Sequence, residues 1–352
     1  MSNKTYNFIR IEKEVASISI NKYRSLFVFK NGEIYNDTKL LYVGTKYFFA
    51  NNLRNEEYFN FGDEVKSYLY KNDERLFLDK YDTNSLNIDG VILYRNSEIT
   101  DVLIQDYYYF NFITNHEILL LEKYVGGCIL VYSNNNKAIF QSYNILTSLS
   151  LQTGNYEWEN NLSKHGEIRK ILGLVNEKLW VVLYETETRK KQLVSLHTAT
   201  GKIIDIIDAT LPLHDWHIAL LEETQTIVSI YGKISTHQKA DSPFVEICAI
   251  TGAVLRNERI ESLFQANLKL GQWCYSNHKI YFTAATDTIN STHIGVLDYT
   301  TLNLEWFTEV KDRKAGIKDL QVTENKIYAL DQGGQLFIFE KEKVVNLKES
   351  SE

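Results

Sequence analysis

The residues of this sequence most suited to chemistry lie close together at His214, Asp215 and His217. Imidazole and carboxylate groups bind metal ions and transfer protons near neutral pH, so this spacing would suit a metal site or an acid–base pair. Trp216 lies between them and adds a large aromatic surface. Because spacing fixes no third ligand, the segment equally fits an ordinary loop whose Trp216 packs under neighbouring structure.

Other charged residues extend the list of candidates without defining a reaction. Asp215 with Asp241, or Glu261 with Asp312, would supply two carboxylates for glycoside hydrolysis, but nothing in the sequence sets their separation. No Gly-rich phosphate loop and no Gly-x-Ser-x-Gly motif occurs, so no catalytic residue can be assigned. The predicted binding residues are therefore His214, Asp215, Trp216, His217, His237, Asp241, Arg313 and Lys314.

A recurring Thr-Gly pair indicates the elements that must position these residues. Copies occur at Thr153-Gly154, Thr200-Gly201 and Thr251-Gly252, and Thr301-Leu302 is a diverged fourth copy. Each follows an apolar strand-like segment, and a spacing near 50 residues is typical of a repeat architecture. Two of the four copies carry a tryptophan four residues later, at Trp158 and Trp306.

A second anchor alternates with the first. An Asn turn followed by Lys opens an apolar run rich in β-formers. Its copies are Asn136-Lys137, Asn176 before Lys178, Asn277 before Lys279, and Asn325-Lys326. The two anchors together divide each repeat into four antiparallel strands, which is the blade of a β-propeller. Chance recurrence of Thr-Gly is the competing interpretation, and the regular alternation argues against it.

The stretch Val296-Leu297-Asp298 through Trp306 resembles the blade-closing motif of the quinoprotein-like, or PQQ-like, propeller family, with Leu302 in place of Gly. The resemblance covers about residues 115–345, where the repeats are clear. It implies an all-β propeller with degenerate blades and does not imply an activity. Quinone-dependent members are typically exported and carry a calcium site and an adjacent pair of cysteines. This sequence has neither an export signal nor neighbouring cysteines, so we expect no cofactor.

The repeats predict a single propeller domain over residues 1–352 with about seven four-stranded blades, and eight as the alternative. Residues 15–110 are expected to form two degenerate blades and residues 115–345 five clearer ones. Residues 5–12 are expected to complete the last blade and close the ring, which removes an open sheet edge. The alternative is that Val344–Leu347 supplies that strand.

In a four-stranded blade, the loops between the second and third strands share one face with the loops between blades. We call this the loop face, and the opposite side, which carries the Thr-Gly turns, the turn face. The longer loops fall on the loop face, where binding residues are expected. They are Glu185–Lys191, Gly232–Pro243, Asp287–His293, Asn161–Glu167, Ala209–His217, Ser262–Asn267 and Lys311–Lys318.

Composition narrows the class of partner. The formal net charge of −7 makes a nucleic-acid partner unexpected, because phosphate binding favours basic surfaces. The three cysteines, Cys128, Cys248 and Cys274, have neither disulfide-framework nor zinc spacing. The sequence has no apolar signal core at residues 1–10 and no run long enough to span a membrane, so a cytoplasmic location is expected.

The aromatic segment 106–112 has two interpretations. Read as a strand, it buries alternate rings between blades; read as a surface, it offers an aromatic platform for a sugar or base.

Three hypotheses for function follow. The first is a non-enzymatic binding or scaffold propeller that recognises a protein partner on the loop face; one form is an inhibitor or immunity-type protein whose acidic surface suits a basic nuclease. The second is an enzyme acting on a carbohydrate or other small ligand at the channel mouth. The third is a structural subunit of a larger assembly, which predicts a large exposed apolar patch.

Overall fold

A computed structural model describes most of the chain. The described residues are 6–12, 14–20, 25–31, 33–36, 39–43, 49–52, 59–62, 67–71, 74–77, 82–86, 90–100, 102–111, 116–125, 129–133, 136–207, 210–234, 240–286 and 290–342. Over residues 49–105 the description covers the backbone of the strands and not their side chains. None of the helices in these ranges is long and apolar enough to cross a membrane.

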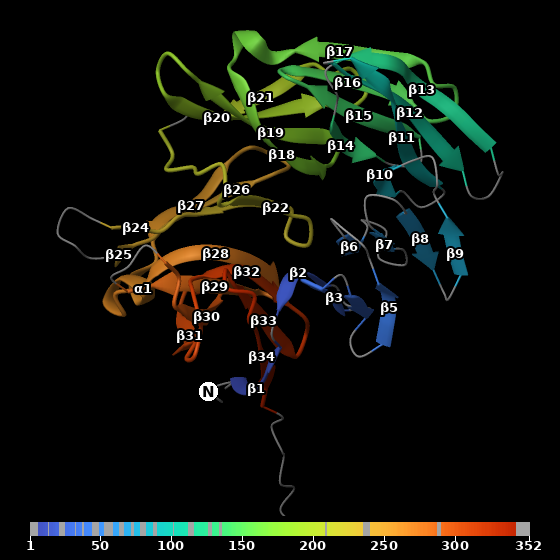
Figure 1. Ribbon diagram of the computed structural model, residues 1–352. Coiled ribbons are helices and arrows are strands. Elements are labelled where there is room, and N and C mark those ends of the chain that lie inside the picture. The colour runs from blue at the N-terminus through green and yellow to red at the C-terminus, as the bar shows by residue number, and fades with distance from the viewer. Residues whose placement is uncertain are drawn as a thin grey trace, which may run out of the picture.

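Eight four-stranded antiparallel sheets follow one another around a ring (Figure 1). The first strand of a sheet contacts the first strand of the next at several places, so the first strands line the centre and the fourth strands lie outermost. This arrangement is a β-propeller, as the repeats predicted. We number the blades along the chain from residue 15.

The strands of blades 1–4 are β2 (Val15–Ile20), β3 (Ser25–Phe29), β4 (Glu33–Asn36), β5 (Lys39–Val43), β6 (Phe49–Asn52), β7 (Phe59–Gly62), β8 (Ser67–Lys71), β9 (Glu74–Phe77), β10 (Asp82–Leu86), β11 (Gly90–Thr100), β12 (Val102–Asn111), β13 (His116–Val125), β14 (Ile129–Ser133), β15 (Lys137–Ser142), β16 (Ile145–Ser150) and β17 (Tyr156–Asn161). The strands of blades 5–7 are β18 (Glu167–Val175), β19 (Lys178–Glu185), β20 (Lys190–His197), β21 (Ile203–Ile207), β22 (Ile218–Leu221), β23 (Thr226–Ile230), β26 (Pro243–Cys248), β27 (Val254–Arg259), β28 (Lys269–Ser276), β29 (Lys279–Ala285), β30 (His293–Asp298) and β31 (Leu304–Glu309). Blade 8 consists of β32 (Ile317–Val322), β33 (Lys326–Asp331), β34 (Leu336–Lys341) and β1 (Tyr6–Glu12). The remaining elements are a small sheet of β24 (Lys233–Ile234) and β25 (Ala240–Asp241), the 3-10 helix η1 (Leu162–Lys164) and the helix α1 (Glu261–Gln265).

The all-β class, the four-stranded blade and the closure of the ring by the N-terminal strand are confirmed. The ring has eight blades, which is the number that the sequence analysis gave as the alternative to about seven. Five blades fall in the predicted range 115–345, whereas residues 15–110 hold two complete blades and most of a third. The two complete ones, at 15–43 and 49–77, use strands of only four to six residues, so a 47-residue period overestimates their length.

Ring closure depends on pairing between the two ends of the chain. β1 pairs antiparallel with β34, from Tyr6 opposite Lys341 to Glu12 opposite Leu336. The amide of Val15, which begins blade 1, then donates to the carbonyl of Gly334 in blade 8 at 2.9 Å. The competing candidate for this strand, 344–347, lies outside the described residues.

The Thr-Gly turns form as predicted, on the turn face. Gly154, Gly201 and Gly252 have positive φ angles of 73°, 67° and 75°, a region that favours glycine. Leu302 adopts the same conformation at φ 56°, although it has a side chain. Its side chain is buried in the core between blades 6 and 7, and this burial offsets the strained backbone.

Three of these turns, at Gly201, Gly252 and Leu302, also receive a side chain from the preceding blade. The accepting group is the carbonyl three residues before the left-handed residue of the turn. The donors at three consecutive interfaces are Trp158 Nε1 to Thr198 O at 2.7 Å, Trp180 Nε1 to Ala249 O at 2.9 Å, and Arg256 Nη2 to Tyr299 O at 3.0 Å. We call these contacts the interblade docks.

Two lysines of the second sequence anchor also contact the turn of the next blade. Lys137 Nζ donates to Thr198 O at 3.2 Å, and Lys178 Nζ donates to Ile250 O at 2.6 Å in the next blade. Carboxylates balance the two charges, Glu157 at 3.0 Å from Lys137 and Asp205 at 2.8 Å from Lys178. Lys137 and Lys178 therefore join blades, besides opening the second strand, whereas Lys279 pairs with Asp298 and Glu305 of its own blade.

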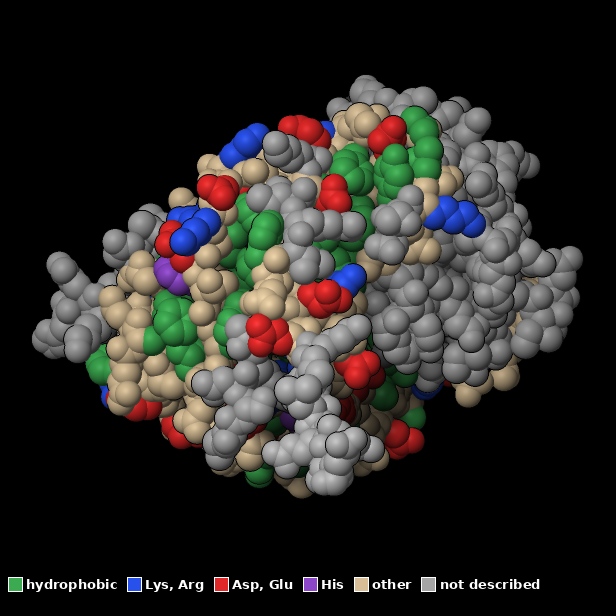
Figure 2. Space-filling model, turned by 90° about the horizontal axis from the view of Figure 1, so that it is seen from below, with side chains coloured by type: hydrophobic (Ala, Val, Ile, Leu, Met, Phe, Trp, Pro, Cys, Tyr) green, Lys and Arg blue, Asp and Glu red, His purple; other side chains and the backbone are tan. Residues whose placement is uncertain are grey.

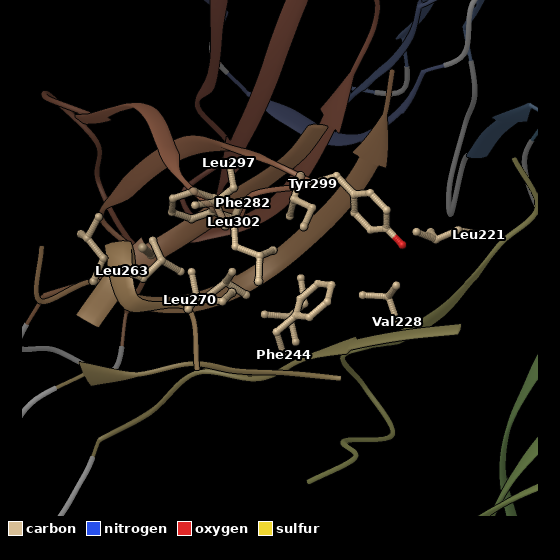
Figure 3. Close-up of a cluster of buried hydrophobic side chains, with 14 residues drawn as sticks. Leu221, Val228, Phe244, Leu263, Leu270, Phe282, Leu297, Tyr299 and Leu302 are labelled. Atoms are coloured by element: carbon tan, nitrogen blue, oxygen red, sulfur yellow. The ribbon is translucent and has the colours of Figure 1, made fainter. Parts of the chain in front are cut away.

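The hydrophobic core is divided among the interfaces between blades. Figure 3 shows one of these clusters, in which Val228 and Phe244 of blade 6 face Leu270 and Phe282 of blade 7. In the aromatic segment 106–112, the rings of Tyr107 and Tyr109 are buried, which favours the strand interpretation over an exposed platform.

Substitution of the turn glycines tests the docks. Gly201→Ala and Gly252→Ala both place a side chain at positive φ, which costs about 1 kcal/mol. A Cβ at Gly201 would lie 2.5 Å from the Trp158 ring, whereas one at Gly252 meets its nearest atom at 3.5 Å. We expect Gly201→Ala to lower the free energy of unfolding in urea by a further ~1–3 kcal/mol. When Trp158 is also replaced by alanine, this extra loss of stability should disappear. Equal losses of stability from Gly201→Ala and Gly252→Ala would contradict close packing of Trp158 against the Gly201 turn.

Candidate functional site

The site is built on the loop face, where blades 5, 6 and 7 meet. Asp215 lies in the connection from blade 5 to blade 6, and Lys191 lies at the start of β20, beside the hairpin inside blade 5. Their side chains form an ion pair, Nζ to Oδ1 at 2.9 Å. A loop between the second and third strands of a blade is thus in contact with a connection between blades, as expected if both lie on the loop face.

Trp216 projects from this connection into solvent. Its side chain is 82% exposed, so the alternative in which Trp216 packs under a neighbouring blade is wrong. Leu213, at the other end of the segment, is buried in the core between blades 5 and 6 and anchors the loop. A buried anchor beside an exposed indole is typical of a loop that presents a side chain.

Hydrogen bonds hold the segment around Trp216 in one conformation. The amide of His214 donates to Ser229 Oγ at 3.2 Å, and the amide of His217 donates to the carbonyl of His214 at 3.0 Å. The His217 carbonyl accepts from the amide of Ile230 at 3.0 Å and from Trp273 Nε1 of blade 7 at 3.3 Å. The indole of Trp216 is therefore presented by a loop fixed to two neighbouring strands.

Aromatic rings pack beneath the loop. The imidazole of His214 stacks on Tyr231 with ring centroids 4.4 Å apart and planes inclined by 16°. The His217 ring lies 4.9 Å from the His214 ring in a tilted arrangement. The two histidines are thus half-buried against a tyrosine rather than directed at a shared ligand. Among the described residues no three His, Cys, Asp or Glu side chains are arranged to hold a metal ion.

Burial and neighbouring charges keep both histidines neutral at pH 7. Burial lowers the pKa of His214, and the Lys191 ammonium lowers it further. Burial, His214 and the Lys170 ammonium lower the pKa of His217. Burial alone would raise the pKa of Asp215, but its hydrogen bond and ion pair with Lys191 outweigh burial and lower it.

The other predicted binding residues make separate contacts. Asp241 is 3.5 Å from Lys233, and His237 lies outside the described residues. Arg313 donates to Glu309 at 3.2 Å and to the carbonyl of Val310 at 2.6 Å, in the connection to blade 8. The amide of Lys314 donates to Asp331 at 2.9 Å in the same connection. Of the eight predicted residues, the structure brings together His214, Asp215, Trp216 and His217.

One member of each predicted carboxylate pair is held by a basic side chain. Asp215 is held by Lys191, and Glu261 is held by Arg259 at 2.7 Å. Hydrogen bonding from Arg259 lowers the pKa of Glu261, whereas a general acid at neutral pH needs a raised pKa. Asp319 on β32 has a pKa raised by burial, but neither predicted pair includes it.

Reasoning from the sequence missed the residues that support Trp216. Lys170 on β18 donates to the carbonyl of Ile218 at 2.7 Å, and Tyr231 and Trp273 contact the loop from two further blades. Lys191 is the last residue of the predicted loop Glu185–Lys191, so the sequence indicated its face but not its role. Lys170, Tyr231 and Trp273 lie within strands or beside them and belong to no motif, so only the folding of the ring brings them to the site.

Two pockets lie between blades 7 and 8, where β1 closes the ring. One of about 140 Å³ on the turn face is lined by Tyr6, Lys279, Tyr281 and Glu305, among others. The other, of about 280 Å³, has a floor of Phe337 and Phe339, with Phe8 at its rim. Neither pocket includes a residue of the Trp216 loop.

Comparison with known proteins supports the fold and gives no family assignment. No protein-family model matches the sequence, and no curated protein matches it. The crystal structure of BamB from Moraxella catarrhalis is similar, with a TM-score of 0.55 and 12% sequence identity, covering 96% of this chain and 100% of that chain. At this identity the similarity bears on the fold alone, and it supports the PQQ-like propeller fold that the Thr-Gly repeats predicted.

The neutral histidines predict how stability depends on pH. The unfolded chain takes up protons at histidine near pH ~6.5, and the folded chain takes them up at lower pH. Folding stability should therefore fall as the pH drops below ~6.5. In urea unfolding at pH 7.5 and 5.5, His214→Asn with His217→Asn should remove at least half of the wild-type loss. His278→Asn, an exposed histidine on the turn face, should not change the loss; an unchanged loss in the double variant would contradict this assignment.

Proposed function

We propose that this chain is a non-enzymatic binding propeller that recognises a protein partner on its loop face. The observation that carries the proposal is Trp216, a fully presented indole on a loop whose backbone is fixed by bonds to Ser229, Ile230 and Trp273. Tryptophan is enriched among the residues that dominate binding energy at protein interfaces. A rigid loop loses little conformational entropy on binding, which favours affinity.

The surroundings of Trp216 match the composition of an interface. Polar and charged side chains, including the Lys191–Asp215 pair, lie around a single large aromatic group, as in a hydrophobic centre with a polar rim. Figure 2, turned by 90° from the view down the ring in Figure 1, shows the side of the ring, where hydrophobic side chains reach the surface in patches with acidic and basic side chains between them.

The proposal takes a finer form in which the chain is an inhibitor or immunity-type protein in the cytoplasm. Its support is the acidic net charge, which would attract a basic toxin before contact. The enzymatic alternative needs a protonated carboxyl paired with a second carboxylate at the channel mouth. One carboxylate of each predicted pair, Asp215 or Glu261, has its pKa lowered by a basic neighbour, which gives the binding function the stronger support.

Substitution of Trp216 tests the proposed function. Immobilised full-length chain should retain one stoichiometric protein partner from its native lysate, and Trp216→Ala should weaken the affinity for that purified partner by at least 30-fold, because a central indole is lost. The matched control is Tyr143→Asn, since Tyr143 is also 82% exposed and lies on the loop face in blade 4. The control should change affinity less than threefold.

Two results would count against the function. Recovery of no stoichiometric partner is the first. Equal affinity of the Trp216→Ala variant and the wild-type chain is the second, because the site would then lie elsewhere. Thermal unfolding of both variants at the wild-type temperature shows that a change in affinity is not a change in folding.

A further inference from the structure

The Trp216 site contains a positive charge that is not neutralised. Lys170 is partly buried on β18, and its ammonium donates to the carbonyl of Ile218 at 2.7 Å. An ammonium has three donors, and no carboxylate in the described part of the chain forms an ion pair with this one. Burial lowers the pKa of Lys170, and the charge of Asp215, which is paired with Lys191, offsets this only in part.

The charges around Lys170 leave a surplus of one. Lys191 and Asp215 neutralise each other at 2.9 Å. The groups that face the site from other elements are His214 and His217 on the loop, whose lowered pKa values favour the neutral imidazole, with the rings of Tyr231 and Trp273 from blades 6 and 7. Lys170 therefore sets the net charge of the site at about +1.

One imidazole atom of the site also lacks a partner. His214 Nδ1 is buried and has no hydrogen-bond partner, and the nearest carboxylate oxygen is Asp215 Oδ1 at 3.7 Å. A buried polar atom without a partner destabilises the folded chain.

We propose that the partner inserts the carboxylate of an Asp or Glu side chain beside Trp216, where it binds Lys170 and the edge of His217. The inference rests on the proposed function and names the chemistry that the partner must present. A carboxylate carries one negative charge, which matches the surplus of one, whereas a phosphate dianion would leave an uncompensated negative charge.

Binding should then be linked to proton uptake. The Lys170 ammonium disfavours a proton on His217 in the free chain, and a carboxylate beside both groups would favour it. The affinity for an acidic segment should therefore increase as the pH falls from 7.5 to 6.0, by about threefold to tenfold. A purely hydrophobic contact at Trp216 would show no such dependence.

The experiment uses the full-length chain and a defined probe. The probe is a capped hexapeptide of glutamate, compared by calorimetry with a capped hexapeptide of glutamine, acetate and inorganic phosphate. Lys170→Met removes the positive charge and keeps the apolar part of the side chain, whereas Lys170→Arg keeps the positive charge. Lys202→Met is the matched control, because Lys202 is an exposed lysine on the turn face.

The glutamate peptide should bind, and Lys170→Met should weaken binding about tenfold, the loss of one charge-assisted contact. Lys170→Arg should retain affinity within threefold, and Lys202→Met should not change it. The inference is overturned if the glutamate peptide does not bind, if it binds the Lys170→Met variant as tightly as wild type, or if inorganic phosphate binds as tightly as the peptide. These results leave the role of Trp216 in partner capture untouched, so the two proposals can fail separately.

Discussion

The structure depends on one repeated contact, a hydrogen bond from a side chain of one blade to a main-chain carbonyl in the turn of the next. A carbonyl at a blade interface is costly to leave without a donor, and at these interfaces the neighbouring blade supplies one. Trp158, Trp180 and Arg256 supply this group at three consecutive interfaces. The accepting carbonyl has the same position in the turn each time, while the donor is tryptophan or arginine. The contact is therefore retained although the sequence of the donor position differs.

The docks explain how a ring of separate sheets can hold a binding loop still. They lie on the turn face and fix the relative positions of blades 4 to 7, while the Trp216 loop lies on the opposite face. That loop makes contacts to blades 5, 6 and 7, so a shift between these blades would disturb it. The site is precise because the interfaces beneath it are closed by hydrogen bonds and apolar packing.

Some of this could be predicted from the sequence. The Thr-Gly turns, the Lys anchors and the closing strand are local patterns, and they predicted the propeller fold. Leu302 shows how the pattern survives without its glycine, because packing holds the backbone at positive φ. The number of blades was less accessible, since the short strands at 15–77 carry no Thr-Gly turn and have a shorter period. At the site, His214 to His217 were found as neighbours in sequence, whereas Lys170 and Trp273 reach them only across blades.

The most direct test of the central contact compares two tryptophans at the same place in the repeat. Trp158 donates its indole N–H to Thr198 O, whereas the described contacts of Trp306 are with the rings of Tyr6 and Phe339, at 5.2 Å and 6.2 Å between centroids. Tryptophan to phenylalanine removes similar volume at both positions, but only at Trp158 does it also remove a donor to a carbonyl of the next blade. Lys137 remains as the second donor to Thr198 O. If the docks hold the ring, urea unfolding should show Trp158→Phe to be more destabilising than Trp306→Phe by ~0.5–1.5 kcal/mol, the net contribution of one hydrogen bond. Equal losses of stability would show that apolar packing alone holds the blades together.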